Sequence, residues 1–188
     1  RAWTKEEYVA RFERVQKKIR AGDIYQLNLT FKARFRLSGS PLTFYRDLRQ
    51  RQRVAYGGIV DTGEVTVLTA SPELFVEMKD RTIETRPMKG TSPRGGTPEA
   101  DAAVRQVLSS DVKQRAENLM IVDLMRNDIG RISEIGSVHV TDLFTVETYR
   151  TLHQMTSGVR ATLLDGITLL DLWRAIFPPG SIIGAPKI

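Results

Sequence analysis

Several residue types and segment types are missing from this sequence. Its 188 residues include no cysteine, which excludes disulfides, thiolate zinc sites, iron–sulfur clusters and a cysteine nucleophile. Only His139 and His153 could supply imidazole, so a metal site built from several histidines is excluded as well. No apolar run approaches the roughly 20 residues of a membrane span, and the first residues do not form a signal peptide. We therefore expect a cytoplasmic protein that has no membrane partner.

The excess of positive over negative charge is also small. Twenty-eight Lys and Arg against 22 Asp and Glu leave a net charge of +6. Lys32, Arg34 and Arg36 lack interleaved aromatic residues that could stack on bases, which argues against nucleic-acid binding. Hydrophobic residues make up 41% of the chain, enough for a buried core. The first residue is not Met and the last residues resemble the start of a helix, so we expect part of a longer polypeptide.

Periodicity and capping residues predict helices and strands in alternating groups. Thr4 and Glu7 form a capping box, and Gly22 ends the helix that follows. Strict alternation predicts a long half-buried strand over residues 26–37, with Gln26 and Asn28 on its polar side. Strands over 54–85 form an antiparallel meander, and strands between helices are typical of an α+β fold. The other predicted helices span 41–50, 98–108, 112–126 and 168–177, the strands 54–60, 64–70, 74–78, 82–85, 137–140, 143–149 and 158–163, and a flexible Gly-rich loop 89–97.

A carboxylate on an apolar stripe is the first candidate functional group. Glu117 precedes Met120, Ile121 and Leu124 at helical spacing, so burial without a partner would be costly. An ion pair with an arginine would satisfy it. Alternatively, Glu117 is a ligand for a hard cation such as Mg²⁺, which one carboxylate, other ligands and water can hold.

Other candidates lie where predicted strands end. Glu73 follows Ser71-Pro72 at a strand junction and is either a turn residue or a functional acid. Lys89 stands at the entry to the Gly-rich loop, where most lysines are solvated, although a desolvated lysine becomes a nucleophile or base. His153 is either a packed polar residue or a catalyst. The 180–184 turn can bind an anion with backbone amides, but most such turns are only turns.

Five stretches carry the most specific pattern: GDIYQLNLT (22–30), ASPELF (70–75), TRPMKGTSPRG (85–95), AENLMIVDLMRNDIGRI (116–132) and FPPGSIIGAPK (177–187). In this order they resemble the chorismate-utilising enzymes, which include anthranilate synthase, aminodeoxychorismate synthase and the isochorismate and salicylate synthases. Because they cover nearly the whole chain, residues 1–188 are identified as a partial chorismate-binding catalytic domain without its C-terminal portion. The resemblance implies an anthranilate synthase component I-like α+β fold, with antiparallel sheets forming a sandwich-like core flanked by helices.

Two positions separate the branches of this family. The isochorismate and salicylate synthases have a water-activating lysine at the position of Gln26, and an amide cannot serve as that base. Anthranilate synthases typically have alanine at the position of Lys89. The motif PMKGT (87–91) is instead similar to the PIKGT of aminodeoxychorismate synthase component I, also called para-aminobenzoate synthase component I. The resemblance therefore favours ammonia-dependent amination of chorismate in folate biosynthesis, with anthranilate synthase component I as the alternative.

The resemblance also implies roles for individual residues. Lys89 would add to chorismate, Glu73 would protonate the departing hydroxyl, and Glu117 would bind Mg²⁺. Ammonia would come from a separate glutamine amidotransferase subunit. The implied substrate-binding residues are Gln26, Gly90, Thr91, His153, Gly180, Ser181 and Gly184.

Two departures from the family pattern bear on these roles. Ile183 replaces the usual threonine of GSITGAPK, so a hydroxyl that could bind substrate is lost. Gln114 stands where an acidic residue often precedes the metal-binding glutamate. Because the family's C-terminal portion carries further magnesium ligands, we expect residues 1–188 alone to be inactive. A non-catalytic scaffold that only binds the glutaminase is the alternative from another class, and the presence of Glu73, Lys89 and Glu117 argues against it.

Overall fold

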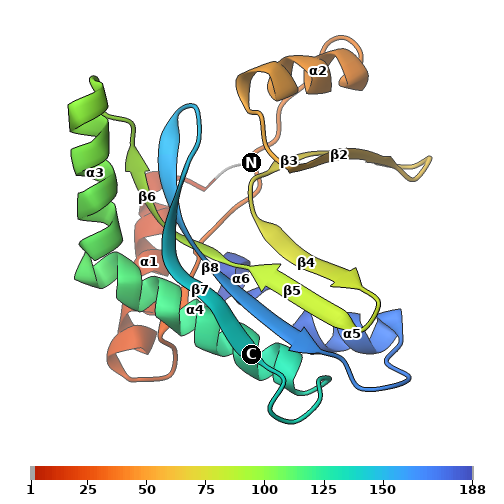
Figure 1. Ribbon diagram of the computed structural model, residues 1–188. Coiled ribbons are helices and arrows are strands. Elements are labelled where there is room, and N and C mark those ends of the chain that lie inside the picture. The colour runs from red at the N-terminus through yellow and green to blue at the C-terminus, as the bar shows by residue number, and fades with distance from the viewer. Residues whose placement is uncertain (1–2, 188) are drawn as a thin grey trace.

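The computed structural model describes residues 3–187 as helices arranged around an antiparallel sheet (Figure 1). The predicted capping box of the first helix is confirmed, with the Thr4 hydroxyl accepting from the Glu7 amide and the Glu7 carboxylate accepting from the Thr4 amide. Serine, threonine or aspartate also caps the next four helices. The helices are α1 (Lys5–Arg20), α2 (Pro41–Arg51), α3 (Pro98–Ser110), α4 (Val112–Gly130), α5 (Leu169–Ile176) and α6 (Gly180–Ile183).

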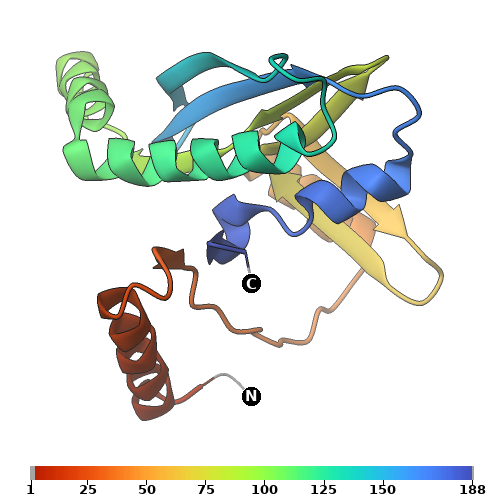
Figure 2. The same cartoon turned by 90° about the horizontal axis from the view of Figure 1, so that it is seen from below.

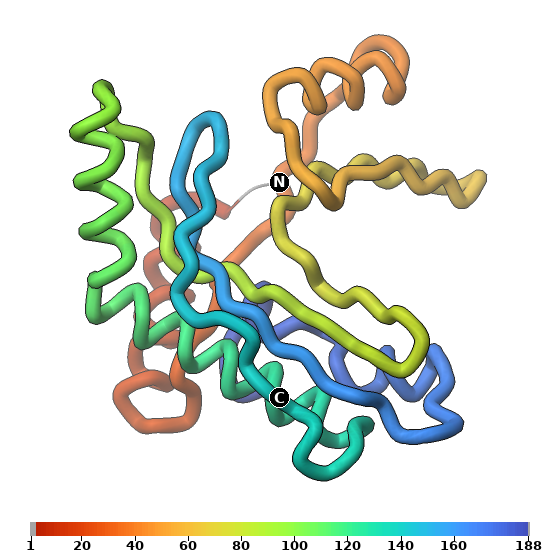
Figure 3. The backbone as a smooth tube through the Cα atoms, in the orientation of Figure 1, coloured from red at the N-terminus to blue at the C-terminus, as the bar shows by residue number. Residues whose placement is uncertain are grey.

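The main sheet is built around one long strand, β8 (Leu152–Thr162). On one side β8 pairs with β7 (His139–Thr148). On its other side β5 (Thr82–Arg86) and β6 (Met88–Pro93) follow one another, and β4 (Leu74–Lys79) pairs with β5. Figure 3 shows the chain passing from β5 to β6 along this edge. Lys89 therefore lies on a strand that is fixed to the centre of the sheet.

One face of the main sheet is covered by α4, with α5 beside it (Figure 2). Ile121, Val122, Met125 and Ile129 of α4 are buried because they recur at helical spacing and point toward the strands. The buried cluster is Ile83, Val122, Ile129, Ile132, Val159, Ala161, Leu163, Leu172, Ala175 and Ile176. This packing fixes α4, and with it Glu117, relative to β6.

The predicted α+β class is confirmed, but the predicted meander over 54–85 is wrong in one respect. It divides between two sheets, because β2 (Tyr56–Asp61) and β3 (Thr66–Ser71) pair only with each other, whereas β4 and β5 join the main sheet. The break falls at Pro72-Glu73, between β3 and β4. The junction thus carries Glu73 out of the strands.

The predicted long strand over 26–37 is also wrong. Only β1 (Gln26–Leu27) is a strand, and it pairs with β9 (Gly184–Ala185). Residues 28–39 run as a single extended segment between β1 and α2, with no described strand alongside (Figure 2). Phe31 and Phe35 remain 47% and 78% exposed. Alternation alone could not make a strand here, because a strand requires a hydrogen-bonded neighbour.

Two further predictions require correction. The prediction of a flexible loop over 89–97 is wrong, because residues 88–93 form β6, which pairs with β8. The strands at 137–140 and 143–149 are one bulged strand, β7, and β8 begins six residues earlier than the predicted 158. The early part of β8 was missed because His153, Thr156 and Ser157 are buried polar residues. A pattern of apolar residues could not reveal them.

Candidate functional site

The predicted residue Gln26 meets the 180–184 segment through backbone pairing. Gln26 is opposite Ala185, and Leu27 is opposite Gly184. Gly184 has a φ of +126°, and a Cβ at this position would lie 2.2 Å from the Gln26 carbonyl oxygen. Only glycine permits this close approach. The structure therefore gives Gly184 a backbone reason for its identity, beside its predicted role in substrate binding.

The same segment is anchored to α4 by charge. Lys187 contacts the buried carboxylate of Asp128 on α4, and its Nζ donates to the Ile176 carbonyl at 2.7 Å. Gly180 packs against the Leu124 side chain, so close that a Cβ would have to displace it. These contacts place α6 between α4 and β1 (Figure 2).

The turn predicted to hold a carboxylate is the short helix α6. The Ile182 and Ile183 amides donate to the Pro179 carbonyl, and the Gly184 amide donates to the Gly180 carbonyl. Those amides are occupied within the turn. Binding of a carboxylate at this turn stays a prediction, and it would have to use amides other than those of Ile182, Ile183 and Gly184.

Asn28 directly follows β1, and its side chain contacts α6 and β6. Its Nδ2 donates to the carbonyls of Ser181 (2.9 Å) and Ile182 (2.8 Å). Its Oδ1 lies 3.5 Å from the Lys89 Nζ and 3.4 Å from the Gln26 Nε2. The structure thus brings together the predicted residues Gln26, Ser181 and Lys89, and adds Asn28 to them.

Glu73 and Lys89 have shifted pKa values in opposite directions. Burial raises the pKa of Glu73 above its ordinary 4.5, although hydrogen bonds from the Ser181 hydroxyl and the Met88 amide and the charge of Lys89 oppose this. Burial lowers the pKa of Lys89 below its ordinary 10.5, and the charges of Glu73 and Glu117 oppose that shift. Both shifts favour the neutral acid and the neutral amine. Such a pair suits proton transfer and nucleophilic addition.

The backbone at Lys89 is held by α4. The buried side chain of Asn118 donates through Nδ2 to the Lys89 carbonyl at 3.3 Å. Gly90 follows with a φ of +107°, at a break in the pairing between β6 and β8. A Cβ at Gly90 would lie 3.0 Å from the Met155 Cβ and 3.4 Å from Gln114 on α4. Gly90 is therefore enclosed between the sheet and α4, and bulges of this kind redirect neighbouring side chains.

Glu117 lies at the rim of this region, and its side chain is 38% exposed. It forms an ion pair with Lys113 at 3.8 Å on the same helix, rather than with the arginine considered from the sequence. Within residues 3–187, no three His, Cys, Asp or Glu side chains are close enough to hold a metal ion together. An accessible carboxylate beside Lys89 fits a single protein ligand for Mg²⁺, an ion that usually keeps waters and substrate oxygens in its shell.

Two predicted substrate contacts lie further along β6 and β8. The Thr91 hydroxyl donates to the Gln154 side chain at 2.9 Å. His153 is 0% exposed, with Nε2 at 2.8 Å from Asp101 and Nδ1 at 3.0 Å from the Thr148 hydroxyl. Both ring nitrogens are thus occupied by protein partners, Asp101 and Thr148, rather than by Lys89 or Glu73.

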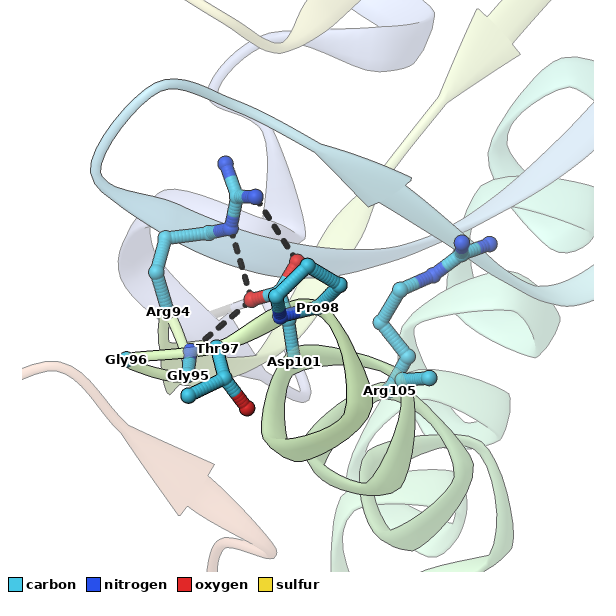
Figure 4. Close-up of a pocket in the computed structure, with 8 residues that line it drawn as sticks. Arg94, Gly95, Gly96, Thr97, Pro98, Asp101 and Arg105 are labelled. Atoms are coloured by element: carbon cyan, nitrogen blue, oxygen red, sulfur yellow. Dashed lines mark hydrogen bonds and ion pairs between the residues drawn. The ribbon is translucent and has the colours of Figure 1, made fainter.

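Asp101 ties the end of β6 to α3 (Figure 4). Its carboxylate accepts two hydrogen bonds from Arg94 and one from the Gly95 amide, whereas the Arg105 side chain points away from it. The Arg94 guanidinium lowers the pKa of Asp101. The pocket at this junction has a volume of about 430 Å³ and includes none of the predicted site residues.

A smaller cavity of about 220 Å³ adjoins Glu73. Ser71, Glu73 and Ser181 supply its polar side chains, and aromatic rings supply much of the remainder. Its other lining residues are Phe75, Trp173, Phe177, Pro179 and Ile182. The apolar wall accounts for the desolvation that shifts the pKa of Glu73.

The structure adds two asparagines that the sequence interpretation did not include as site residues. The sequence pattern places Asn28 beside Gln26 on the polar side of a strand, and this shared parity is the available signal. Asn118 follows Glu117 in the AENLM stretch, but an asparagine in a helix gave no reason to expect a bond to the Lys89 carbonyl.

Comparison with known proteins gives consistent similarities. The family model described as "chorismate binding enzyme" matches residues 1–188. Aminodeoxychorismate synthase component 1 of Klebsiella aerogenes is 44% identical over 98% of this chain and 41% of its own length. Anthranilate synthase component 1 of Methanothermobacter marburgensis is 41% identical over 98% of this chain and 40% of its own length. The chain thus spans about two fifths of the length of these curated relatives.

A solved structure supports the fold. The crystal structure of anthranilate synthase component I from Streptococcus pneumoniae TIGR4 superposes with a TM-score of 0.77 at 37% identity, covering 93% of this chain and 38% of that one. The anthranilate synthase component I-like fold predicted from the sequence is thereby confirmed. In the described part of the chain, no helix has the length and apolar character needed to span a bilayer.

Proposed function

The chain belongs to the chorismate binding enzyme family, and on this premise we propose that it catalyses the amination of chorismate to 4-amino-4-deoxychorismate. The observation that carries the proposal is Lys89, whose partly buried amine has a lowered pKa and lies in the field of Glu73 and Glu117. An unprotonated lysine is the form that can add to carbon. We further propose that residues 1–188 are part of a longer catalytic polypeptide and that a glutamine amidotransferase partner supplies ammonia.

The proposed reaction consists of two displacements. The neutral Lys89 amine adds at C2 of chorismate, the ring double bonds shift, and the C4 hydroxyl leaves as water with a proton from Glu73. Ammonia then attacks C4, the electrons shift back to expel Lys89 as a neutral amine, and the new C4 ammonium returns a proton to Glu73. The net change is chorismate plus ammonia to 4-amino-4-deoxychorismate plus water. Burial of Glu73 serves this step because it raises the pKa of the carboxyl and so favours the protonated form.

Glu117 would hold Mg²⁺ together with substrate oxygens and water. When bound, the ion would neutralise the ring carboxylate of the substrate and stabilise charge that develops there. Gln26, Ser181 and the amide of Gly180 would contact the substrate on the side of α6. The enclosed Gly90 would keep β6 close to α4, so that Lys89 and Glu117 face the same substrate.

Anthranilate synthesis is the second candidate, favoured by the 41% identity to anthranilate synthase component 1 of Methanothermobacter marburgensis. The deciding experiment incubates the full-length protein with chorismate, Mg²⁺ and an ammonium salt. A product that a lyase converts to para-aminobenzoate supports the proposal. Anthranilate formed directly supports the second candidate, and no product supports a non-catalytic scaffold.

The pH dependence of kcat/KM tests the protonation states. Activity requires protonated Glu73 and neutral Lys89, so the active form is at its maximum between the two macroscopic pKa values of the pair. The pKa of Glu73 is raised above 4.5 and the pKa of Lys89 is lowered below 10.5. We therefore expect a bell-shaped pH profile that is narrower than the one these ordinary pKa values would give. The measurement is initial rate against pH at low chorismate. Activity that stays constant from pH 5 to pH 10 would contradict the assignment.

Removal of the Glu117 carboxylate tests metal binding. We expect Glu117→Gln to raise the Mg²⁺ concentration for half-maximal activity by at least about tenfold, because a ligand is lost. The matched control is Lys113→Met, which breaks the 3.8 Å ion pair but keeps the carboxylate. This exposed pair should contribute only a few tenths of a kcal/mol. Equal Mg²⁺ dependence in both variants would show that Glu117 serves only the ion pair.

A further inference from the structure

The orientation of the Asn28 side-chain amide is fixed by its surroundings. Its nitrogen lies 2.9 Å from the Ser181 carbonyl and 2.8 Å from the Ile182 carbonyl, so both of its N–H bonds have acceptors. The flipped amide would place an oxygen against two carbonyl oxygens, and three acceptors cannot bond to one another. The Asn28 Oδ1 must therefore face the opposite way, toward the Lys89 Nζ and the Gln26 Nε2.

This oxygen is an uncharged acceptor that lies beside the Lys89 amine, at 3.5 Å from Nζ. The charged groups that act on Lys89 are Glu73, from the junction before β4, and Glu117, from α4. A third carboxylate at position 28 would further stabilise the ammonium form, which cannot add to substrate. An amide oxygen accepts one N–H and thereby limits rotation of the amine, with no added negative charge. The lone pair of the Lys89 nitrogen then points away from Asn28.

We propose that Asn28 is a positioning residue for Lys89: the α6 carbonyls hold its amide, and its Oδ1 orients the amine. The catalytic consequence rests on the proposed function, whereas the contact itself does not. The amine is thereby coupled to α6, because any shift of Ser181 or Ile182 would turn the Asn28 amide. Asn118 holds the Lys89 backbone from α4, so two asparagines from separate elements fix the two ends of this residue.

Two substitutions separate orientation of the amine from a merely structural role. Asn28→Asp and Asn28→Ala both lose the bonds to the two α6 carbonyls, so any effect through α6 is common to both. Their direct effects on Lys89 are opposite. The new carboxylate favours the ammonium and raises the pKa of Lys89, whereas loss of the oxygen removes an acceptor from the ammonium and lowers it.

The experiment measures the reaction of Lys89 with limiting acetic anhydride against pH in the full-length protein, followed by peptide mass spectrometry. Below the pKa, we expect Asn28→Asp to lower Lys89 acetylation by about tenfold and Asn28→Ala to raise it about twofold or more, since one pKa unit is tenfold. In both variants kcat should fall, with a smaller change in the KM for chorismate. The control Gln106→Glu adds the same charge on exposed α3 and should change neither quantity.

Shifts of the Lys89 pKa in the same direction in both variants, or no shift in either, would overturn the proposal. Circular dichroism reports whether each variant folds. Should either variant unfold, Asn28→Ser is measured as well, because it also lacks the amide oxygen and should lower the pKa of Lys89. The proposed lysine addition is tested separately by Lys89→Met. If that variant aminates chorismate at the normal rate, addition of Lys89 to the substrate is wrong, while acetylation of Lys89 in the Asn28 variants still decides whether the contact exists.

Discussion

Replacing Lys89 by methionine is expected to lower kcat for ammonia-dependent amination of chorismate by at least about 10³-fold. Methionine preserves the length and most of the volume of the lysine stem but has no nucleophilic nitrogen. Lys89 is partly buried on β6, and its backbone is held by Asn118, so the substitution should leave the strand in place. The measurement is single-turnover formation of 4-amino-4-deoxychorismate at saturating chorismate, Mg²⁺ and ammonium.

The matched control is Lys79→Met, which makes the same change at an exposed position of β4. It should retain normal kcat. Glu73→Gln distinguishes the acid from the nucleophile, because an amide cannot protonate the departing hydroxyl while Lys89 remains able to add. A Lys89→Met enzyme that aminates as fast as Lys79→Met would exclude lysine addition, and the reaction would then have to be direct attack by ammonia.

The parts of the fold that the sequence predicts depend on local chemistry. Thr4 with Glu7, and Ser40 before Pro41, define helix starts within four residues of chain, and both helices begin as predicted. Pairing between distant segments is not encoded in this way. The apolar alternation over 26–37 satisfies every local rule for a strand, yet only two of its residues find a strand partner. Leu27 lies opposite Gly184, which is 157 positions further along the chain. Local pattern indicates what a segment can form, and pairing decides what it does form.

The same distinction applies to the site. Glu73, Lys89 and Glu117 could be singled out because carboxylates and amines at strand ends or on apolar stripes are costly unless they have partners. Asn28 has no such cost in the sequence, since a polar residue on the polar side of a strand needs no explanation. Its importance comes from carbonyls 153 and 154 residues further along the chain. The shifted pKa values of Glu73 and Lys89 likewise come from burial that only the folded chain creates.

Gly184→Ala is expected to destabilise the protein by about 3 kcal/mol and to lower kcat by about 10²-fold. The residue combines a φ of +126° with backbone atoms of Gln26 only 2.2 Å from the position of a Cβ. Strained backbone and overpacking each cost about 1–3 kcal/mol. Because the clash is with main chain rather than a flexible side chain, β1 must move. The measurements are urea unfolding and steady-state kinetics.

Gly96→Ala is the matched control, because that position has open space and no positive φ. A compatible glycine-to-alanine change should leave stability equal or raise it by about 0.5 kcal/mol. Equal stability and activity in both variants would contradict the close pairing of β1 with β9. The loss of activity should exceed what partial unfolding explains, since β1 contributes little to the buried core. Its pairing with β9 serves mainly to set Gln26 and Asn28 against α6, and through Asn28 the amine of Lys89.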